Sequence, residues 1–206
     1  MPRSKSSNNW IRRHINDPFV KKAQLEGYRS RSAYKLIELN EKDRLIKPGM
    51  FLLDLGSAPG GWSQVAARLV GGKGRVLATD ILPMDPIKGV EFVQGDFTDQ
   101  AVVTAMIQSL GGEKFDLIVS DIAPNITGID SADQASSMYF LDLALDTVRL
   151  TLKRRAGFVA KMFQGSGSDQ YVKDLRTSFE KVLIRKPSAS RAESREVYIV
   201  AKGFKG

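Results

Sequence analysis

The chain has 206 residues, 42% of them apolar, which is enough for one domain with a sizeable buried core and excludes a disordered chain. It holds no cysteine and a single histidine, so disulfides, thiolate metal sites and a zinc site built on histidines are excluded. The net charge is +8, and residues 1–35 alone carry nine basic and two acidic residues, a pattern that favours an anionic partner.

Residues 1–30 predict a basic N-terminal extension that is partly flexible and binds RNA, because clustered lysine and arginine side chains attract the phosphate backbone. Four aromatic residues lie between the charges, and a purely solvated tail does not need them: Trp10, Phe19, Tyr28 and Tyr34. For residues 1–8 taken alone, a solvated tail is the simpler interpretation. A second basic cluster lies at 181–195. The sequence has neither the apolar core of a signal peptide nor the ~20-residue apolar run of a membrane span, so we expect a cytoplasmic protein with no membrane partner. No sequence feature suggests an oligomer, so we expect a monomer.

After about residue 30 the sequence alternates between strand and helix patterns. The predicted strands are 50–56, 75–80, 90–96, 115–121, 157–163, 181–187 and 196–204. The predicted helices are 32–45, 60–69, 99–110, 131–152 and 169–179. This alternation predicts one α/β domain over residues 31–206, with a mostly parallel seven-stranded sheet and helices on both faces. The last two strands follow each other without a helix, so we expect an antiparallel edge strand.

The segment DLGSAPGGW (54–62) follows the first strand, where a doubly wound sheet binds its ligands. Gly56 permits a sharp exit from the strand, and Gly60 and Gly61 let backbone N–H groups approach a ligand. The loop has neither the G-x-G-x-x-G of dinucleotide sites nor the G-K-[ST] of phosphate-binding loops. By itself the loop is weak evidence, because structural turns of this kind are common.

Three later strands end in aspartate: Asp80, Asp96 and Asp121. A single aspartate at a strand end is often only a turn former or helix cap. Asp80 lies 24 residues after Gly56, close to the ~20 expected for an acid that holds ribose hydroxyls. Three carboxylates at one rim of the sheet point to a polar, cationic ligand with a ribose. S-adenosylmethionine fits this description, and no metal is required.

Six motifs in order (DLGSAPGGWSQ, DILPMDP, QGDF, SDIAPN, KMFQG and SREVYIVA) resemble the FtsJ/RrmJ family of ribose 2′-O-methyltransferases. The resemblance runs from about residue 10 to the C-terminus. It implies a Rossmann-like S-adenosylmethionine-dependent methyltransferase fold and methyl transfer to a ribose 2′-hydroxyl. Within the family, the bacterial member acting on 23S ribosomal RNA of the large ribosomal subunit is the nearest, which implies a uridine there as the target.

The resemblance also implies the site residues. The catalytic tetrad of the family falls on Lys35, Asp121, Lys161 and Glu196, and its cofactor contacts fall on Gly56, Gly60, Trp62, Asp80, Asp96 and Asp121. Taken singly, Lys35 could be a solvated residue of a helix, and Glu196 could be a charged residue of an edge strand. Lys161 is harder to dismiss, because it interrupts an apolar strand where an unpaired ammonium group is costly to bury.

Lys161 is the candidate general base for the 2′-hydroxyl, a role that requires its neutral amine. Desolvation and the like charge of Lys35 would favour that form, whereas Asp121 and Glu196 would oppose it; a purely orienting role remains the alternative. Tyr198 and Trp10 are candidates for stacking on an unpaired base, although core positions suit both. The alternative functions are a transfer RNA ribose methyltransferase, a non-catalytic RNA-binding ribosome-assembly factor and a nicotinamide-dependent oxidoreductase.

Overall fold

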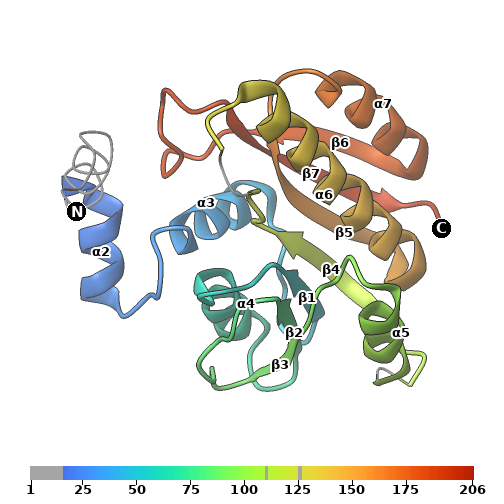
Figure 1. The fold of residues 1–206 in the computed structure, drawn as a ribbon. Coiled ribbons are helices and arrows are strands. Elements are labelled where there is room, and N and C mark those ends of the chain that lie inside the picture. The colour runs from blue at the N-terminus through green and yellow to red at the C-terminus, as the bar shows by residue number, and fades with distance from the viewer. Residues whose placement is uncertain (1–15, 110, 125–126) are drawn as a thin grey trace.

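The structure is a computed structural model that describes residues 16–109, 111–124 and 127–206, so Trp10 lies outside the described part of the chain. Seven strands form one sheet: β1 Phe51–Leu55, β2 Arg75–Asp80, β3 Val90–Gln94, β4 Phe115–Ser120, β5 Leu152–Phe163, β6 Phe179–Arg185 and β7 Glu196–Phe204. The helices are α2 Pro18–Glu26, α3 Ala33–Asp43, α4 Gly61–Val70, α5 Gln100–Ser109, α6 Asp130–Thr151 and α7 Ser168–Ser178 (Figure 1).

The strand order is β3-β2-β1-β4-β5-β7-β6. The first five strands of this order, β3, β2, β1, β4 and β5, pair in parallel. Strand β7 lies between β5 and β6 and runs antiparallel to both. The predicted mostly parallel, seven-stranded sheet with antiparallel pairing at one edge is therefore confirmed. The order reverses between β1 and β4, which is where an open α/β sheet forms its ligand crevice.

Helices cover both faces of the sheet because alternate strand side chains point to opposite sides. On one face Leu53 and Ile118 pack with α6 and α7, and on the other Leu52 and Val119 pack with α3 and α4. All five residues of β1 are buried, as expected for a central parallel strand. This two-sided core holds the strand ends rigidly, and the functional side chains are attached to those ends.

Helix α2 was not among the predicted elements, although it has clear boundary signals. The Asp17 carboxylate accepts a hydrogen bond from the Phe19 amide at 2.9 Å, and Pro18 occupies the first turn. Gly27 ends the helix in a left-handed conformation with φ 75°. The Asp-Pro pair and the glycine nine residues later were sequence signals for a short helix.

Two of the aromatic residues that alternate with the N-terminal charges belong to the core. Tyr28 and Tyr34 are 7% and 5% exposed, and their rings meet edge to face with centroids 5.6 Å apart. Tyr34 lies on α3 and packs with Tyr28 and Phe19, so these rings are part of the core and do not present their faces to bases. Within the described residues, no helix combines the length and the apolar character needed to cross a membrane.

Strand β5 begins five residues earlier than predicted. Helix α6 ends at Thr151 and β5 continues from Leu152 without a loop. Its register against β4 is interrupted, because Phe115 faces Leu152 but Leu117 faces Gly157. The four residues in between, 153–156, form an irregularity at the amino end of the strand, which the polar sequence KRRA concealed from the strand pattern.

Candidate active site

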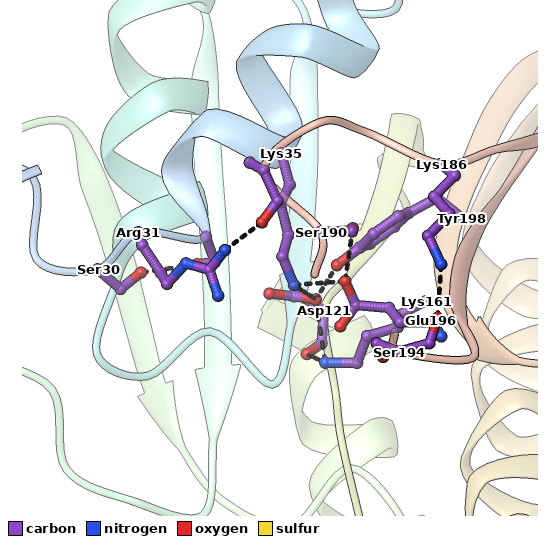
Figure 2. Close-up of polar contacts among 12 residues, drawn as sticks. Ser30, Arg31, Lys35, Asp121, Lys161, Lys186, Ser190, Ser194, Glu196 and Tyr198 are labelled. Carbon is purple, nitrogen blue, oxygen red and sulfur yellow. Dashed lines mark hydrogen bonds and ion pairs between the residues drawn. The ribbon is translucent and has the colours of Figure 1, made fainter. Parts of the chain in front are cut away.

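Four charged side chains from distant parts of the sequence meet at the carboxyl ends of β4 and β5 (Figure 2). Lys35 lies on α3, Asp121 directly follows β4, Lys161 lies in β5 and Glu196 begins β7. The β5–β7 register pairs Lys161 with Tyr198, which brings Glu196 within two residues of the same point. The structure thus brings together all four residues of the expected tetrad.

The four groups form a chain of alternating charge. The Lys35 Nζ atom lies 2.7 Å from Glu196 Oε1 and 4.0 Å from Asp121 Oδ1. On the other side of Asp121, Lys161 Nζ lies 3.0 Å from Oδ1 and donates a hydrogen bond to the Asp121 carbonyl oxygen at 2.6 Å. Opposite charges at these distances compensate one another, which reduces the cost of burying side chains that are 16% exposed or less.

Tyr198 and Ser190 support the two carboxylates. The Tyr198 hydroxyl donates to Asp121 Oδ1 at 2.6 Å, and the Ser190 hydroxyl donates to Glu196 Oε1 at 2.7 Å. The Tyr198 ring is completely buried, and its centroid is 5.7 Å from that of Trp62. Tyr198 is therefore a core residue that orients Asp121, and the alternative of stacking on an RNA base is wrong for it.

The electrostatics of Asp121 and Tyr198 follow from this geometry. Burial by itself would raise the pKa of Asp121, but the charges of Lys161 and Lys35 and the Tyr198 hydrogen bond outweigh it and lower that pKa. Burial, followed by the negative charge of Asp121, raises the pKa of Tyr198 well above its ordinary value. The site therefore holds Asp121 as a carboxylate and Tyr198 as a hydrogen-bond donor at neutral pH.

A cavity of about 400 Å³ adjoins Asp121 at the crevice between β1 and β4. Its wall includes Gly56 and three aspartates, Asp80, Asp96 and Asp121. The prediction that the aspartates at three strand ends gather at one rim of the sheet is confirmed. The Asp80 carboxylate also fixes two loops, because it accepts hydrogen bonds at 2.8 Å from the amides of Ala58 and Leu82.

Gly56 is required by the shape of this cavity. It has φ 69°, and a Cβ atom there would lie 2.0 Å from Cγ1 of Ile122. Ile122 follows Asp121 and lines the same cavity. The loop after β1 can therefore approach the loop after β4 only with glycine at this position.

Comparison with known proteins identifies the family. A family model described as FtsJ-like methyltransferase matches residues 28–204. The chain belongs to the FtsJ-like methyltransferase family. It is therefore a methyltransferase, and the resemblance inferred from the motifs is confirmed.

Several relatives match the chain over its whole length. It is 66% identical to Ribosomal RNA large subunit methyltransferase E of Stutzerimonas stutzeri over 100% of both chains. It is 64% identical to the protein of the same name from Marinobacter nauticus, over 100% of this chain and 99% of the relative. A crystal structure of a Plasmodium falciparum protein described as a ribosomal RNA methyltransferase superposes with a TM-score of 0.77 at 32% identity, covering 87% of this chain and 100% of that one.

The residues expected to contact the family's cofactor do not all line the larger cavity. Gly56, Asp80, Asp96 and Asp121 line it, whereas Trp62 lines a smaller neighbouring space of about 40 Å³. The Trp62 indole N–H donates to the Ser32 carbonyl at 2.8 Å, which ties α4 to the start of α3. A Cβ atom at Gly60 would lie 2.6 Å from Cδ1 of Ile87 and 2.9 Å from Sδ of Met84, so the lack of a side chain allows two loops to approach each other.

The residues around the two spaces suit S-adenosylmethionine, the methyl donor that the motifs imply. The Ser57 hydroxyl at the smaller space is buried and, among the described residues, has no hydrogen-bond partner. Burial, with the nearby charges of Asp121 and Asp80, raises the pKa of Asp54 at the same space to about 7, although its hydrogen bond with Ser63 opposes the rise. An unpaired hydroxyl beside several carboxyl groups fits a ligand that carries both polar and cationic groups.

The basic residues near the active site make more hydrogen bonds and ion pairs within the protein than their clustering in the sequence predicted. The Arg29 guanidinium donates to the carbonyl oxygens of Pro59, Asp85 and Pro86 at 2.7–3.1 Å, and so joins the two loops that surround Gly60. Arg31 pairs with Asp17 at 3.1 Å. The later cluster is similar: Arg185 pairs with Asp43, Lys186 with the Ser194 carbonyl and Arg195 with Asp130. No sequence signal separates these structural roles from phosphate binding.

Proposed function

We propose that the protein transfers a methyl group from S-adenosylmethionine to the ribose 2′-hydroxyl of a uridine in 23S ribosomal RNA of the large subunit. The alternating chain formed by Lys35, Asp121, Lys161 and Glu196 beside the cavity is the observation that carries this proposal. Two relatives at 66% and 64% identity carry a name that specifies the large-subunit RNA, which supports this substrate over transfer RNA. We also propose that the enzyme acts as a monomer in the cytoplasm.

Residues around the two spaces would bind the methyl donor. Asp80 and Asp96 can accept hydrogen bonds from its ribose hydroxyls. Asp54, Ser57 and Asp121 can accept hydrogen bonds from its cationic groups, and the two carboxylates can compensate the positive charge. When bound, the donor supplies an electrophilic methyl carbon attached to a positively charged sulfur. Because that charge is consumed as the oxygen–methyl bond forms and the sulfur–methyl bond breaks, alignment of the hydroxyl should provide much of the acceleration.

Lys161 is the residue that we assign to the attacking hydroxyl. Asp121 holds its amino group at two points, 3.0 Å from the carboxylate and 2.6 Å from the carbonyl, so the direction of the group is fixed. We propose that the neutral amine of Lys161 accepts the hydroxyl proton and becomes an ammonium ion as the methyl group is transferred. Lys35 compensates the charges of Asp121 and Glu196 during this change.

Variants of Lys161 test the assignment. Lys161→Ala should lose at least about 100-fold in turnover and keep its affinity for S-adenosylmethionine. Lys161→Arg retains the charge but cannot lose a proton, so it should be equally inactive if Lys161 is the base; substantial activity in this variant would leave only an orienting role. Lys173→Ala, an exposed lysine on α7, is the control for the loss of a positive charge.

The substrate is tested with labelled S-adenosylmethionine and purified RNAs. Incorporation into 23S ribosomal RNA or large subunits, mapped to one uridine 2′-hydroxyl, is the expected result. Incorporation into transfer RNA alone would reverse the choice of substrate. Absence of transfer to any RNA, with intact cofactor binding, would favour the non-catalytic assembly factor.

A further inference from the structure

A second cavity, which we call the basic-end cavity, lies at the end of the sheet away from the tetrad. Its volume is about 390 Å³, within the range of small-ligand sites. Six basic residues line it: Arg44, Lys47, Lys153, Arg154, Arg155 and Lys202. The lining has one acidic residue, Asp116, so it carries five more positive than negative charges.

The basic-end cavity and the tetrad lie at opposite ends of the same two strands. Along β4 the cavity contacts Asp116, and the tetrad residue Asp121 lies five positions later. Along β5 it contacts Gly157, four positions before Lys161. At roughly 3.3 Å per strand residue, about 15 Å of protein separates the two sites. Strands β4 and β5 run side by side across this distance (Figure 1).

Four of the six positive charges have no acidic partner among the described residues. Lys153 pairs with Asp116 at 2.9 Å, and Lys202 lies 4.0 Å from Asp43. Arg44, Lys47, Arg154 and Arg155 are exposed and belong to none of the ion pairs of the described chain. This contrasts with Arg29 and Arg31, whose guanidinium groups bond to carbonyl oxygens or to a carboxylate within the fold.

The backbone at this cavity is also unusual. Within the described residues, the non-glycine positions with positive φ are Arg44, at 50°, and Arg155, at 65°, and both line the cavity. Arg155 lies in the irregular segment of β5, and Arg44 ends α3. A left-handed conformation is unfavourable for arginine, and strain of this kind tends to persist where a site requires it. Two separate segments of the chain thus place a residue with a strained backbone in the wall of the same positively charged cavity.

We propose that the basic-end cavity binds phosphate groups of the substrate RNA at a second point, remote from the nucleotide that is methylated. This inference rests on the proposed RNA methyltransferase function. Unpaired arginine and lysine side chains around a concave surface are the chemistry that binds phosphate oxygens. The two sites open at opposite ends of the sheet with about 15 Å of protein between them, so a strand held in the active site would have to leave it and pass around the outside of the domain to reach the cavity. A folded RNA can instead present a second segment there.

Two pairs of substitutions test the proposal. Arg154→Gln with Arg155→Asn removes two charges from β5, and Arg44→Asn with Lys47→Gln removes two from the segment after α3. Asparagine tolerates the left-handed conformation, so the fold should persist, which thermal unfolding verifies. The control pair is Lys173→Gln with Arg176→Gln, which removes two exposed charges from α7.

The first measurement is the dissociation constant for folded large-subunit RNA as a function of salt concentration. Each cavity pair should weaken binding roughly tenfold and reduce the slope of log affinity against log salt by about 1.5, since about 0.7–0.9 is lost for each phosphate contact. The control pair should change neither value. Equal behaviour of the cavity pairs and the control pair would overturn the proposal.

Turnover separates this inference from the proposed function. At saturating RNA the cavity pairs should keep the parent rate of methyl transfer, because the tetrad is untouched, whereas failure of the parent protein to transfer methyl groups would contradict the proposed function itself. A short RNA containing the target uridine should bind parent and cavity variants equally. Thermal stabilisation of the parent, and not of the cavity variants, by inorganic phosphate or ATP with unchanged RNA affinity would assign the cavity to a small phosphate ligand and overturn the proposal.

Discussion

Replacing Asp54 with asparagine removes a carboxyl group that is 1% exposed at the end of β1 and leaves a side chain of nearly the same size. The Ser63 hydroxyl donates to Asp54 Oδ2 at 2.6 Å, and an asparagine oxygen can accept the same bond. Burial raises the pKa of Asp54 from 3.8 to about 7, and the charges of Asp121 and Asp80 add to the rise. The carboxyl group thus makes the free energy of unfolding depend on pH in a range where most carboxylates do not titrate.

The direction and size of this effect follow from the two pKa values. Between pH 4 and pH 7 the unfolded chain has lost the Asp54 proton while the folded protein still holds it, so raising the pH favours unfolding. The pKa difference of about three corresponds to about 4 kcal/mol over the whole range, of which about 3 kcal/mol falls between pH 5 and pH 8. Above pH 8 both states are ionised and the dependence ends.

Urea unfolding at several pH values measures the difference in stability between the parent and Asp54→Asn. Subtraction removes the contributions of groups that titrate equally in both proteins, and Asp54→Asn should gain about 3 kcal/mol relative to the parent between pH 5 and pH 8. Ser63→Ala is the second variant. The Ser63 hydrogen bond lowers the pKa of Asp54, so removing that bond should raise this pKa and move the fall in stability to higher pH. A difference between parent and Asp54→Asn that is independent of pH would refute the reasoning.

Two further predictions concern the geometry of the site and of its supporting sheet. Gly56→Ala should lower the affinity for S-adenosylmethionine at least tenfold, because its Cβ would lie 2.0 Å from Ile122; titration calorimetry measures this, and parent affinity would contradict it. Arg185→Ala should destabilise the protein by about 2–3 kcal/mol in urea unfolding, because the buried Asp43 carboxylate, whose pKa is lowered by hydrogen bonding to Arg185, would lose both guanidinium hydrogen bonds and keep the more distant Lys202, at 4.0 Å, as its charged partner. Adding Asp43→Asn should recover part of that loss, and no recovery would argue against an incompletely compensated charge as the cause.

The sheet and the rim of aspartates could be predicted because local sequence determines them. Apolar runs such as 51–55 and 115–120 are strands with nearly complete burial. The carboxyl ends of parallel strands necessarily share one edge of the sheet, so Asp80, Asp96 and Asp121 had to gather there. The four tetrad residues were found by resemblance to the family, since no local pattern relates Lys35 to Glu196.

The roles of the basic and aromatic residues could not be predicted from composition. Tyr28 and Tyr34 alternate with charges in the sequence, yet both are buried in the core, because α2 folds back over them through Phe19 and Glu26. Arg29 counts as a phosphate-binding charge in the sequence, and in the structure it joins two loops through three carbonyl oxygens. Whether a charge is satisfied within the fold depends on contacts between residues far apart in the chain, which charge patterning does not contain.

The register of the sheet explains how the chain places charged groups in a buried site. Ser120 of β4 faces Ala160 of β5, so the next residue of each strand brings Asp121 beside Lys161. In the β5–β7 ladder Lys161 faces Tyr198, whose hydroxyl reaches Asp121 from the other side. A slip of one residue in β5 would turn Lys161 to the opposite face and leave it unpaired among apolar side chains. The apolar packing on both faces prevents this slip, and it thereby fixes the position of the lysine to which we assign the proton transfer.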